Sequence, residues 1–218
     1  MVSVIFVGAE SAGNVGALAR VMKNFGFSDL ILVSPQCDIA SDECKARAKH
    51  AYDVVEKARV LPSLEKAIKG FDTVVGTTAR LAVHYKETRA VTTPERLSQN
   101  LKGSVVIIFG RESSGLTNSE IALCNVLASI PTNPKYGSLN VTHAAAIVLY
   151  ELSRFEAKGE PASQASLESL YAVFADAAGR SKMKNKDMAG KVFRNVCSRA
   201  FIDEAEARIL TGALKQKQ

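Results

Sequence analysis

The stretch that decides the fold of this chain is Phe109-Gly-Arg-Glu-Ser-Ser-Gly-Leu116, followed after a short apolar run by Ile130-Pro-Thr-Asn-Pro-Lys-Tyr-Gly-Ser-Leu-Asn-Val-Thr-His-Ala144. Both loops follow short apolar strands, and both carry polar side chains that a simple turn does not need. Loops at strand ends are where α/β proteins keep their chemistry. We therefore expect the functional site in these two loops.

Apolar runs alternate with helical periodicity on either side of these loops. Continuous apolar runs of this kind are typical of a parallel sheet that is covered on both faces. The sequence therefore predicts an α/β fold with a mostly parallel sheet and helices on both faces. The expected strands are 2–7, 30–33, 73–75, 105–109 and 126–130, and the expected helices are 14–25, 41–59, 63–69, one opened by Pro94, a short one from Thr117 to Cys124, and 140–157.

The alternation ends at Gly159-Glu-Pro-Ala-Ser-Gln164, and only helical patterns follow, at 167–178, 188–199 and 203–215. We place a first domain at 1–158, a linker at 159–165 and a helical extension at 166–218. About sixty residues are marginal for an independent fold. The extension is therefore expected to pack on the first domain or on a second subunit.

Composition narrows the class of protein. The four cysteines are scattered without a CxxC pair, which is typical of reduced thiols in a cytoplasmic protein. The three histidines are equally scattered, so no metal site is expected. The first apolar run is too short for a signal peptide, and no stretch is long enough to span a bilayer.

Positive charge is concentrated in the helical extension. The chain has a net charge of +6 and an isoelectric point near 9.2. Between Arg180 and Arg199 there are seven basic residues and one acid. This segment is either a surface for nucleic-acid phosphates or a solvated helical face, and charge alone does not decide between them.

The turn Gly8-Ala-Glu-Ser-Ala-Gly-Asn-Val-Gly16 invites comparison with a dinucleotide-binding loop. The spacing is not G-x-G-x-x-G, and Ser34-Pro35 stands where an acid should hold a ribose hydroxyl. A nicotinamide oxidoreductase is therefore a distant alternative. A plain strand-to-helix turn explains the glycines, but it does not explain Asn14 and Arg20.

Three segments together resemble the motifs of the SpoU branch of the SPOUT RNA methyltransferases. They are Asn14–Arg20, Phe109–Leu116, and Ile130-Pro with Ser138-Leu-Asn-Val141, in the family's order and spacing. The resemblance covers residues 1 to about 158. The helical extension is similar to the C-terminal part of TrmJ-type tRNA enzymes, chiefly at Lys191–Arg194 and Glu204–Gly212.

This resemblance implies a fold and a reaction. The fold would contain a deep trefoil knot in its C-terminal segment, which is rare among proteins and does not follow from the residues themselves. The reaction would be 2′-O-methylation of tRNA by S-adenosylmethionine, at nucleotide 32 of the anticodon loop. The family is also dimeric, which implies a homodimer with a site shared between the protomers.

The resemblance also assigns roles to residues. It implies a catalytic group of Asn14, Arg20, Glu112, Ser138 and Asn140. The cofactor would be held by Thr77, Thr78, Ala79, Gly110, Ile130, Gly137, Ser138 and Leu139. We assign RNA contacts to Arg20, Tyr85, Arg89, Lys182, Lys184, Lys186, Lys191 and Arg194.

Physical chemistry limits what these side chains can do. Arginine is a poor base because its pKa lies above about 12, so Arg20 is better suited to orient a phosphate and to stabilise a developing oxyanion. Glu112 either holds a hydrogen-bond network together or forms an ion pair with Arg111 or Arg20. His143 stands among alanines within a helix and receives no catalytic role.

The long polar stretch from Arg80 to Thr92 is expected to form either a lid that contacts RNA, with Tyr85 offering a stacking face, or a disordered surface loop. Two other functions also stay open. One is the same reaction on ribosomal RNA, and the other is a knotted RNA-binding protein without catalysis.

Overall fold

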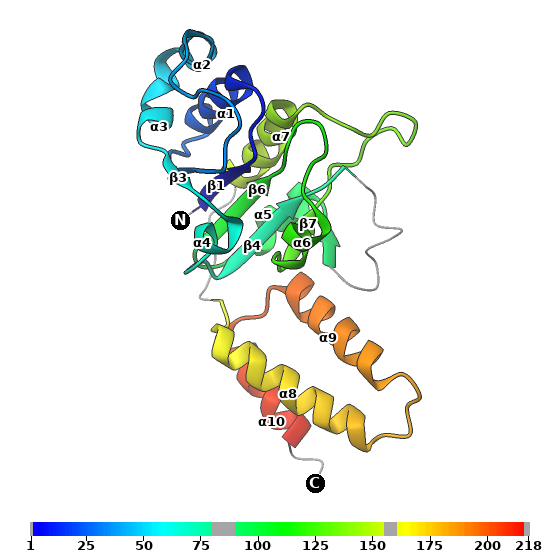
Figure 1. Cartoon of the computed structure of the whole chain (residues 1–218). Coiled ribbons are helices and arrows are strands. Elements are labelled where there is room, and N and C mark those ends of the chain that lie inside the picture. The colour runs from blue at the N-terminus through cyan, green and yellow to red at the C-terminus, as the bar shows by residue number, and fades with distance from the viewer. Residues whose placement is uncertain (1, 80–89, 155–160, 216–218) are drawn as a thin grey trace.

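The computed structural model describes residues 2–79, 90–154 and 161–215. Its centre is a seven-stranded sheet in which every pair of neighbours is parallel, in the order β3-β2-β1-β6-β4-β7-β5 (Figure 1). The strands are β1 Val2–Val7, β2 Leu30–Val33, β3 Arg59–Leu61, β4 Thr73–Thr77, β5 Ala90–Thr92, β6 Val105–Phe109 and β7 Val126–Ala128.

Successive side chains of each central strand enter two different apolar cores. Val4 and Phe6 of β1 lie in a core with helices α1, α2, α3, α5 and α7, whereas Ile5 and Val7 lie in a second core with α4 and α6. Strands that are buried on both faces need continuous apolar sequence, which is what these runs supply. The predicted α/β class with helices on both faces is confirmed.

The helices begin where the sequence supplies caps. Ser11, Thr93 and Thr117 each accept a hydrogen bond from a backbone N–H in the first turn, and Thr117 forms the expected capping box with Glu120. The helices of the first part are α1 Ala12–Asn24, α2 Asp42–Ala48, the 3₁₀ turn η1 Lys49–Ala51, α3 Tyr52–Glu56, α4 Leu64–Ala67, α5 Pro94–Asn100, α6 Asn118–Ala122 and α7 Val141–Ser153.

The prediction of one helix over 41–59 is wrong. The chain breaks at Lys49, whose φ of 52° and ψ of −129° lie outside the helical region, and the last residue of the predicted helix, Arg59, begins strand β3. The apolar positions Ala51 and Val55 continue with helical spacing across the break, so periodicity did not reveal it. Strand β5, at the end of the long polar stretch, was also missed, because its three residues do not belong to a continuous apolar run.

The helical extension consists of α8 Gln164–Arg180, α9 Lys186–Ala200 and α10 Glu204–Lys215. Its small core contains Leu170, Tyr171 and Cys197. Pro161 of the predicted linker forms an isolated bridge with Asp203, and the extension contacts the α/β part at an ion pair of 3.4 Å between Lys102 and Asp203. Since α8 begins at Gln164, the last two residues of the predicted linker belong to a helix.

The sequence predicts reduced cysteines, no metal site and no membrane-spanning segment, and the structure bears on each of these within the described residues alone. All four cysteines are free thiols there. No group of His, Cys, Asp or Glu in the described ranges could hold a metal ion. None of the described helices is long and apolar enough to cross a membrane.

Candidate functional site

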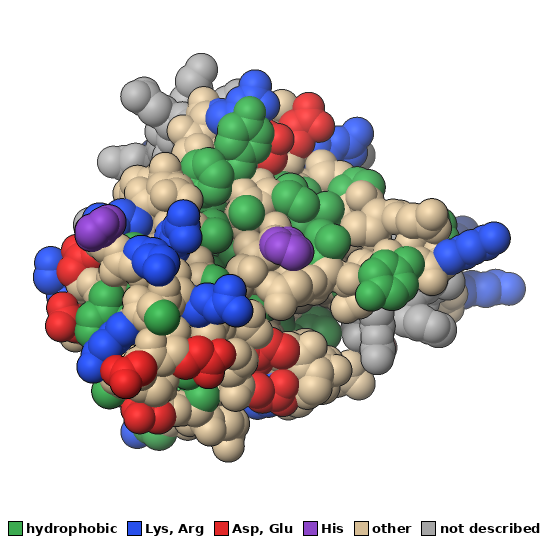
Figure 2. All heavy atoms as spheres, turned by 90° about the horizontal axis from the view of Figure 1, so that it is seen from above, with side chains coloured by type: hydrophobic (Ala, Val, Ile, Leu, Met, Phe, Trp, Pro, Cys, Tyr) green, Lys and Arg blue, Asp and Glu red, His purple; other side chains and the backbone are tan. Residues whose placement is uncertain are grey.

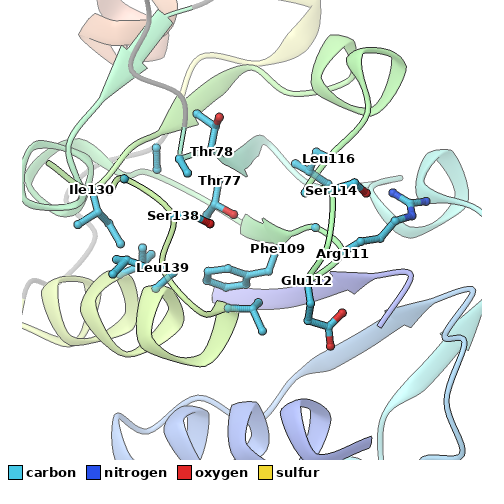
Figure 3. Close-up of a pocket in the computed structure, with 18 of the residues that line it drawn as sticks. Thr77, Thr78, Phe109, Arg111, Glu112, Ser114, Leu116, Ile130, Ser138 and Leu139 are labelled. Carbon is cyan, nitrogen blue, oxygen red and sulfur yellow. The ribbon is translucent and has the colours of Figure 1, made fainter. Parts of the chain in front are cut away.

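A cavity of about 450 Å³ lies where β4, β6 and β7 end. Three loops meet there: residues 77–79 after β4, residues 110–116 after β6 and residues 130–139 after β7 (Figure 3). Because parallel strands end on the same edge of a sheet, loops far apart in sequence converge at that edge. The sequence-predicted cofactor residues all line this one cavity, namely Thr77, Thr78, Ala79, Gly110, Ile130, Gly137, Ser138 and Leu139.

Hydrogen bonds hold the three loops in place. The Thr77 hydroxyl donates to the Ile108 carbonyl at 2.8 Å, and the Thr78 N–H donates to the Ala128 carbonyl at 3.0 Å. The Thr132 hydroxyl donates to the Gly137 carbonyl at 3.1 Å, which closes the long loop on itself. The walls of the cavity are therefore formed largely before any ligand binds.

Gly110 is required by a close approach of two backbone segments. A Cβ atom at this position would lie 2.3 Å from the carbonyl carbon of Gly115 and 2.4 Å from the amide nitrogen of Leu116. Any other residue would push the 110–116 loop open. Gly110 thus shapes the cavity wall through the side chain that it lacks.

Glu112 joins this loop to the start of α1. Its Oε2 accepts from the Glu10 N–H at 2.9 Å, and its Oε1 accepts from the Ser11 N–H and the Asn14 side-chain amide, both at 3.0 Å. In Figure 3 the carboxylate points away from Arg111. Of the two roles left open by the sequence, the structure therefore places Glu112 in a hydrogen-bond network.

Asn14 continues this network to the third motif. Its Oδ1 accepts from the Asn140 side-chain amide at 3.4 Å. Asn140 also caps α7, since its Oδ1 accepts from the Thr142 N–H at 2.8 Å. The chain Glu112–Asn14–Asn140 thus links three predicted catalytic residues, and the fourth, Ser138, lines the adjacent cavity.

Arg111 forms its ion pair with Glu120 rather than with Glu112. Both guanidinium nitrogens donate to the carboxylate at 3.0 Å. Burial alone would raise the pKa of Glu120, but hydrogen bonds from Arg111 and Thr117 lower it below its ordinary value of 4.5. The positive charge of Arg111 is therefore neutralised beside the cavity, and the loop is anchored to α6.

The structure does not bring Arg20 into the cavity lining. Arg20 lies on the exposed face of α1, beyond Asn14, in a separate shallow depression. No hydrogen bond or ion pair engages its side chain within the described ranges. Its catalytic role stays a prediction, and the described chain presents it next to the site rather than inside it.

The predicted RNA contacts of the extension fall into two groups. Lys182, Lys184 and Lys191 are exposed. Lys186 donates a hydrogen bond to the Gly179 carbonyl. Arg194 pairs with Glu168 at 3.2 Å and lies 4.3 Å from the Tyr171 ring centroid, so it also stabilises the packing of α8 on α9. Tyr85 and Arg89 lie outside the described residues.

Two features of the site were missed by sequence reasoning. Glu10 accepts from the Ser113 N–H at 3.0 Å and the Ser113 hydroxyl at 2.7 Å, so it reciprocates the bonds of Glu112. Its position in a glycine-rich turn was the available signal. The apolar floor comes from Phe109 at the end of β6 and from Val141, Ala144 and Val148 of α7, whose helical spacing gave no reason to separate them from ordinary core.

The cavity fits a small, partly apolar cation. Its volume lies in the usual range of about 300–1,000 Å³ for small-molecule sites. Leu116, Ile130 and Leu139 offer apolar surface, and the three loops offer backbone polar groups. Among the described lining residues the one side-chain cation, Arg111, is neutralised by Glu120. These are suitable surroundings for an adenosyl group attached to a sulfonium.

Comparison with known proteins gives consistent results. The model of the SpoU rRNA Methylase family matches residues 1–150. A protein of Methanocaldococcus jannaschii named tRNA (cytidine-2′-O-)-methyltransferase TrmJ is 34% identical over 228 residues, which cover 99% of both chains.

Solved structures agree with the sequence relatives. The crystal structure of TrmJ from Z. mobilis ZM4 superposes with a TM-score of 0.69 at 29% identity, covering 99% of this chain and 98% of that one. An AdoMet-bound rRNA methyltransferase from Sinorhizobium meliloti superposes with a TM-score of 0.58 at 26% identity, covering 70% of this chain and 56% of that one. The helical extension is thus included in the first match.

Proposed function

We propose a reaction on the premise that this chain belongs to the SpoU rRNA methylase family, whose model matches residues 1–150. In this proposal the chain is an S-adenosylmethionine-dependent methyltransferase that methylates a ribose 2′-hydroxyl of tRNA. The observation that carries this proposal is the convergence of the loops 77–79, 110–116 and 130–139 on one cavity, with Asn14 of the first motif joined to its side by the Glu112–Asn14–Asn140 network. The similarity to TrmJ enzymes over almost the whole chain favours tRNA as the substrate.

The residues of the cavity would hold the cofactor. When bound, S-adenosylmethionine supplies an electrophilic methyl group on a positively charged sulfur. Ile130 and Leu139 would contact the faces of the adenine, and the backbone of residues 77–79 and 137–139 would bind its polar edge. Gly110 keeps the opposite wall close to the ligand.

The catalytic side chains would act on the ribose and its phosphate. Arg20 orients the phosphate and stabilises the oxygen as it loses its proton, since a guanidinium donates several hydrogen bonds and stays charged. Asn14 positions the ribose, and Glu112 holds Asn14 through the bond of 3.0 Å. Ser138 and Asn140 complete the group from the far loop.

We also propose the trefoil knot and a homodimer. The 130–139 loop closes the cavity and leads into α7, which packs against α1. On α7, Ile147 and Tyr150 expose 39% and 48% of their surface, which offers a suitable contact for a second copy. Light scattering of the purified chain tests the dimer. Stretching a single molecule from both ends tests the knot, because a knotted chain stays shorter than its full contour length.

The first experiment is methyl transfer from labelled S-adenosylmethionine to unmodified tRNA transcripts, followed by nucleoside analysis and mapping. The expected product is a 2′-O-methylated cytidine or uridine at position 32, made in the cytoplasm. Transfer to ribosomal RNA alone would keep the reaction and replace the substrate. Cofactor binding without transfer to any RNA would support a non-catalytic RNA-binding protein and overturn the proposal.

We assign the helical extension, residues 166–218, to tRNA binding, and residues 1–158 to catalysis. Exposed lysines between α8 and α9 support this division, because phosphate contacts are made mainly by Lys and Arg. A truncation test is unsuitable, since the extension packs on Lys102. Point substitutions of its lysines, described below, test the assignment.

A further inference from the structure

A shallow depression of about 380 Å³ lies at the end of α1, away from the cavity. Arg20, Lys23 and Asn24 line it from α1, and Lys49 and His50 line it from the turn after α2. No carboxylate is among its described lining residues. Figure 2 looks down on this side of the molecule and shows Lys and Arg side chains gathered beside a histidine.

The backbone at Lys49 is strained. Its φ of 52° is in the region that favours glycine, and it interrupts the helical stretch between α2 and η1. Strained residues are retained where the surrounding structure or a function requires them. Because the chain keeps a lysine where glycine would be favoured, the side chain of Lys49 is a candidate for a function.

The other two non-glycine residues with positive φ in the described chain have structural side chains. The Ser34 hydroxyl donates to the Pro62 carbonyl at 2.9 Å, and Phe201 is buried in the main core. Lys49 differs from both, because it is exposed and no described residue forms a hydrogen bond or ion pair with its ammonium. Within the described residues, the Lys49 ammonium therefore contributes no hydrogen bond or ion pair to the stability of the fold.

Lys23 holds the depression together. Its ammonium donates to the His50 carbonyl and to the Asp53 carboxylate, both at 2.7 Å. This fixes the turn that carries Lys49 against α1 and neutralises Asp53. Arg20 and Lys49 are then left as two unneutralised cations on the rim of one rigid depression.

We propose that this depression binds a backbone phosphate of the RNA substrate, next to the nucleotide that is methylated. The inference rests on the proposed function and extends it. From Asn14, which is hydrogen-bonded to Glu112 in the cavity wall, to Lys23 is nine residues of α1, or about 13.5 Å at 1.5 Å per residue. An RNA strand whose ribose lies near Asn14 and Arg20 can follow this exposed side of α1 and place a flanking phosphate between Arg20 and Lys49.

The test compares Lys49→Gly, Lys49→Arg and Lys66→Ser in steady-state methylation of tRNA at several salt concentrations. Glycine relieves the strain, so Lys49→Gly should fold, with a thermal midpoint at or above that of the parent. We expect its KM for tRNA to rise about fivefold, with a much smaller change in kcat, as for one lost charged contact. The slope of log affinity against log salt should fall by about 0.7–0.9.

The two other variants serve as controls. Lys49→Arg keeps the charge and should retain the affinity for tRNA. Lys66 is an exposed cation on α4, on the other face of the sheet, and Lys66→Ser should leave KM and the salt slope unchanged. If Lys49→Gly matches the parent in both quantities, the depression is not a phosphate site. If the parent itself transfers no methyl group to tRNA, the proposed function fails instead, and the two failures are thus distinguished.

Discussion

The α/β part and the helical extension of this chain are built in opposite ways. The largest fully buried side chains of the described residues, Phe6 and Phe109 among them, all belong to the α/β part. The buried core cluster of the extension has three residues, while Val192, Val196 and Ile209 expose 46%, 44% and 70% of their surface. Because buried apolar area is the main source of stability, the α/β part can hold a catalytic geometry that the extension cannot.

This contrast suggests a division of labour. A site that must position a methyl donor needs loops fixed by a rigid scaffold, which the sheet provides. A surface that follows RNA phosphates needs charge and reach more than rigidity, which the extension provides through its exposed lysines. Substitutions of the catalytic side chains in the first part should therefore change the rate constant, and substitutions of the exposed lysines in the extension should change the affinity for tRNA.

The largest effect is expected from Arg20→Ala. Removing a charged donor that stabilises a developing oxyanion should lower kcat by about 10²–10³-fold. Calorimetric affinity for S-adenosylhomocysteine should stay within about twofold, because Arg20 lies outside the cavity lining. A parallel loss of cofactor affinity would show that Arg20 belongs to the cofactor site and not to the acceptor side.

The next effect is expected from Gly110→Ala. The new Cβ would meet the backbone of Gly115 at 2.3 Å, so the loop must move and cofactor affinity should fall by about tenfold or more. Gly190→Ala on α9 is the matched control, because open space surrounds that position. It should leave cofactor affinity unchanged and raise the thermal midpoint slightly, since alanine favours helix.

A smaller effect on RNA should follow from replacing Lys182, Lys184 and Lys186 together by serine. We expect tRNA affinity, measured by filter binding at physiological salt, to fall by about tenfold, and its salt dependence to weaken. Cofactor affinity should not change. Unchanged tRNA affinity would mean that the extension serves only for packing, and would remove the basis for the division of labour.

A pH-dependent effect is expected from Glu120→Gln. The folded-state pKa of Glu120 is lowered, so its stabilising contribution is present above the unfolded pKa and is lost as the pH falls through the folded pKa. The variant should be less stable than the parent at pH 7 by about 1 kcal/mol, and this gap should close below about pH 4. Urea denaturation between pH 3 and 7 measures the difference in unfolding free energy between the two proteins. A difference that does not change with pH would contradict the lowered pKa of Glu120.

The smallest effect is expected from Glu168→Gln, which breaks the exposed pair with Arg194. Exposed ion pairs contribute about 0–1 kcal/mol, so global unfolding should barely change. Amide hydrogen exchange in α8 and α9 should nevertheless accelerate, because the extension has little other core. Asp176→Asn is the control, because it breaks an exposed pair with Arg180 that lies within α8 and does not join α8 to α9.

Much of the fold followed from local sequence. The continuous apolar runs of β1, β2 and β6 predict buried parallel strands, and the Thr117 capping box marks the start of α6. The break at Lys49 and the strand β5 were not predictable, because both are imposed by tertiary contacts rather than by periodicity. Strand β7 is equally short, but it lies in a continuous apolar run, whereas β5 ends a polar stretch.

The site was predictable as a set of residues but not as a geometry. The motifs named the residues that line the cavity, yet the partner of Glu112 depends on how two loops approach one another, about 100 residues apart in sequence. Arg20 likewise lies outside the cavity because the fold places its side chain on the exposed side of α1. Spacing along the chain contains no information of that kind.

The strand order affects when the sheet can form while the chain is synthesised on the ribosome. Strand β6 lies between β1 and β4, so the first 100 residues leave two of the central strands without their shared neighbour. Pairings of such long sequence separation form late and expose unpaired edges until they do. The cavity also needs Val148 of α7, so nascent chains shorter than this cannot contain the complete cavity. Synthesis therefore leaves the growing chain without its complete binding site until Val148 has been added.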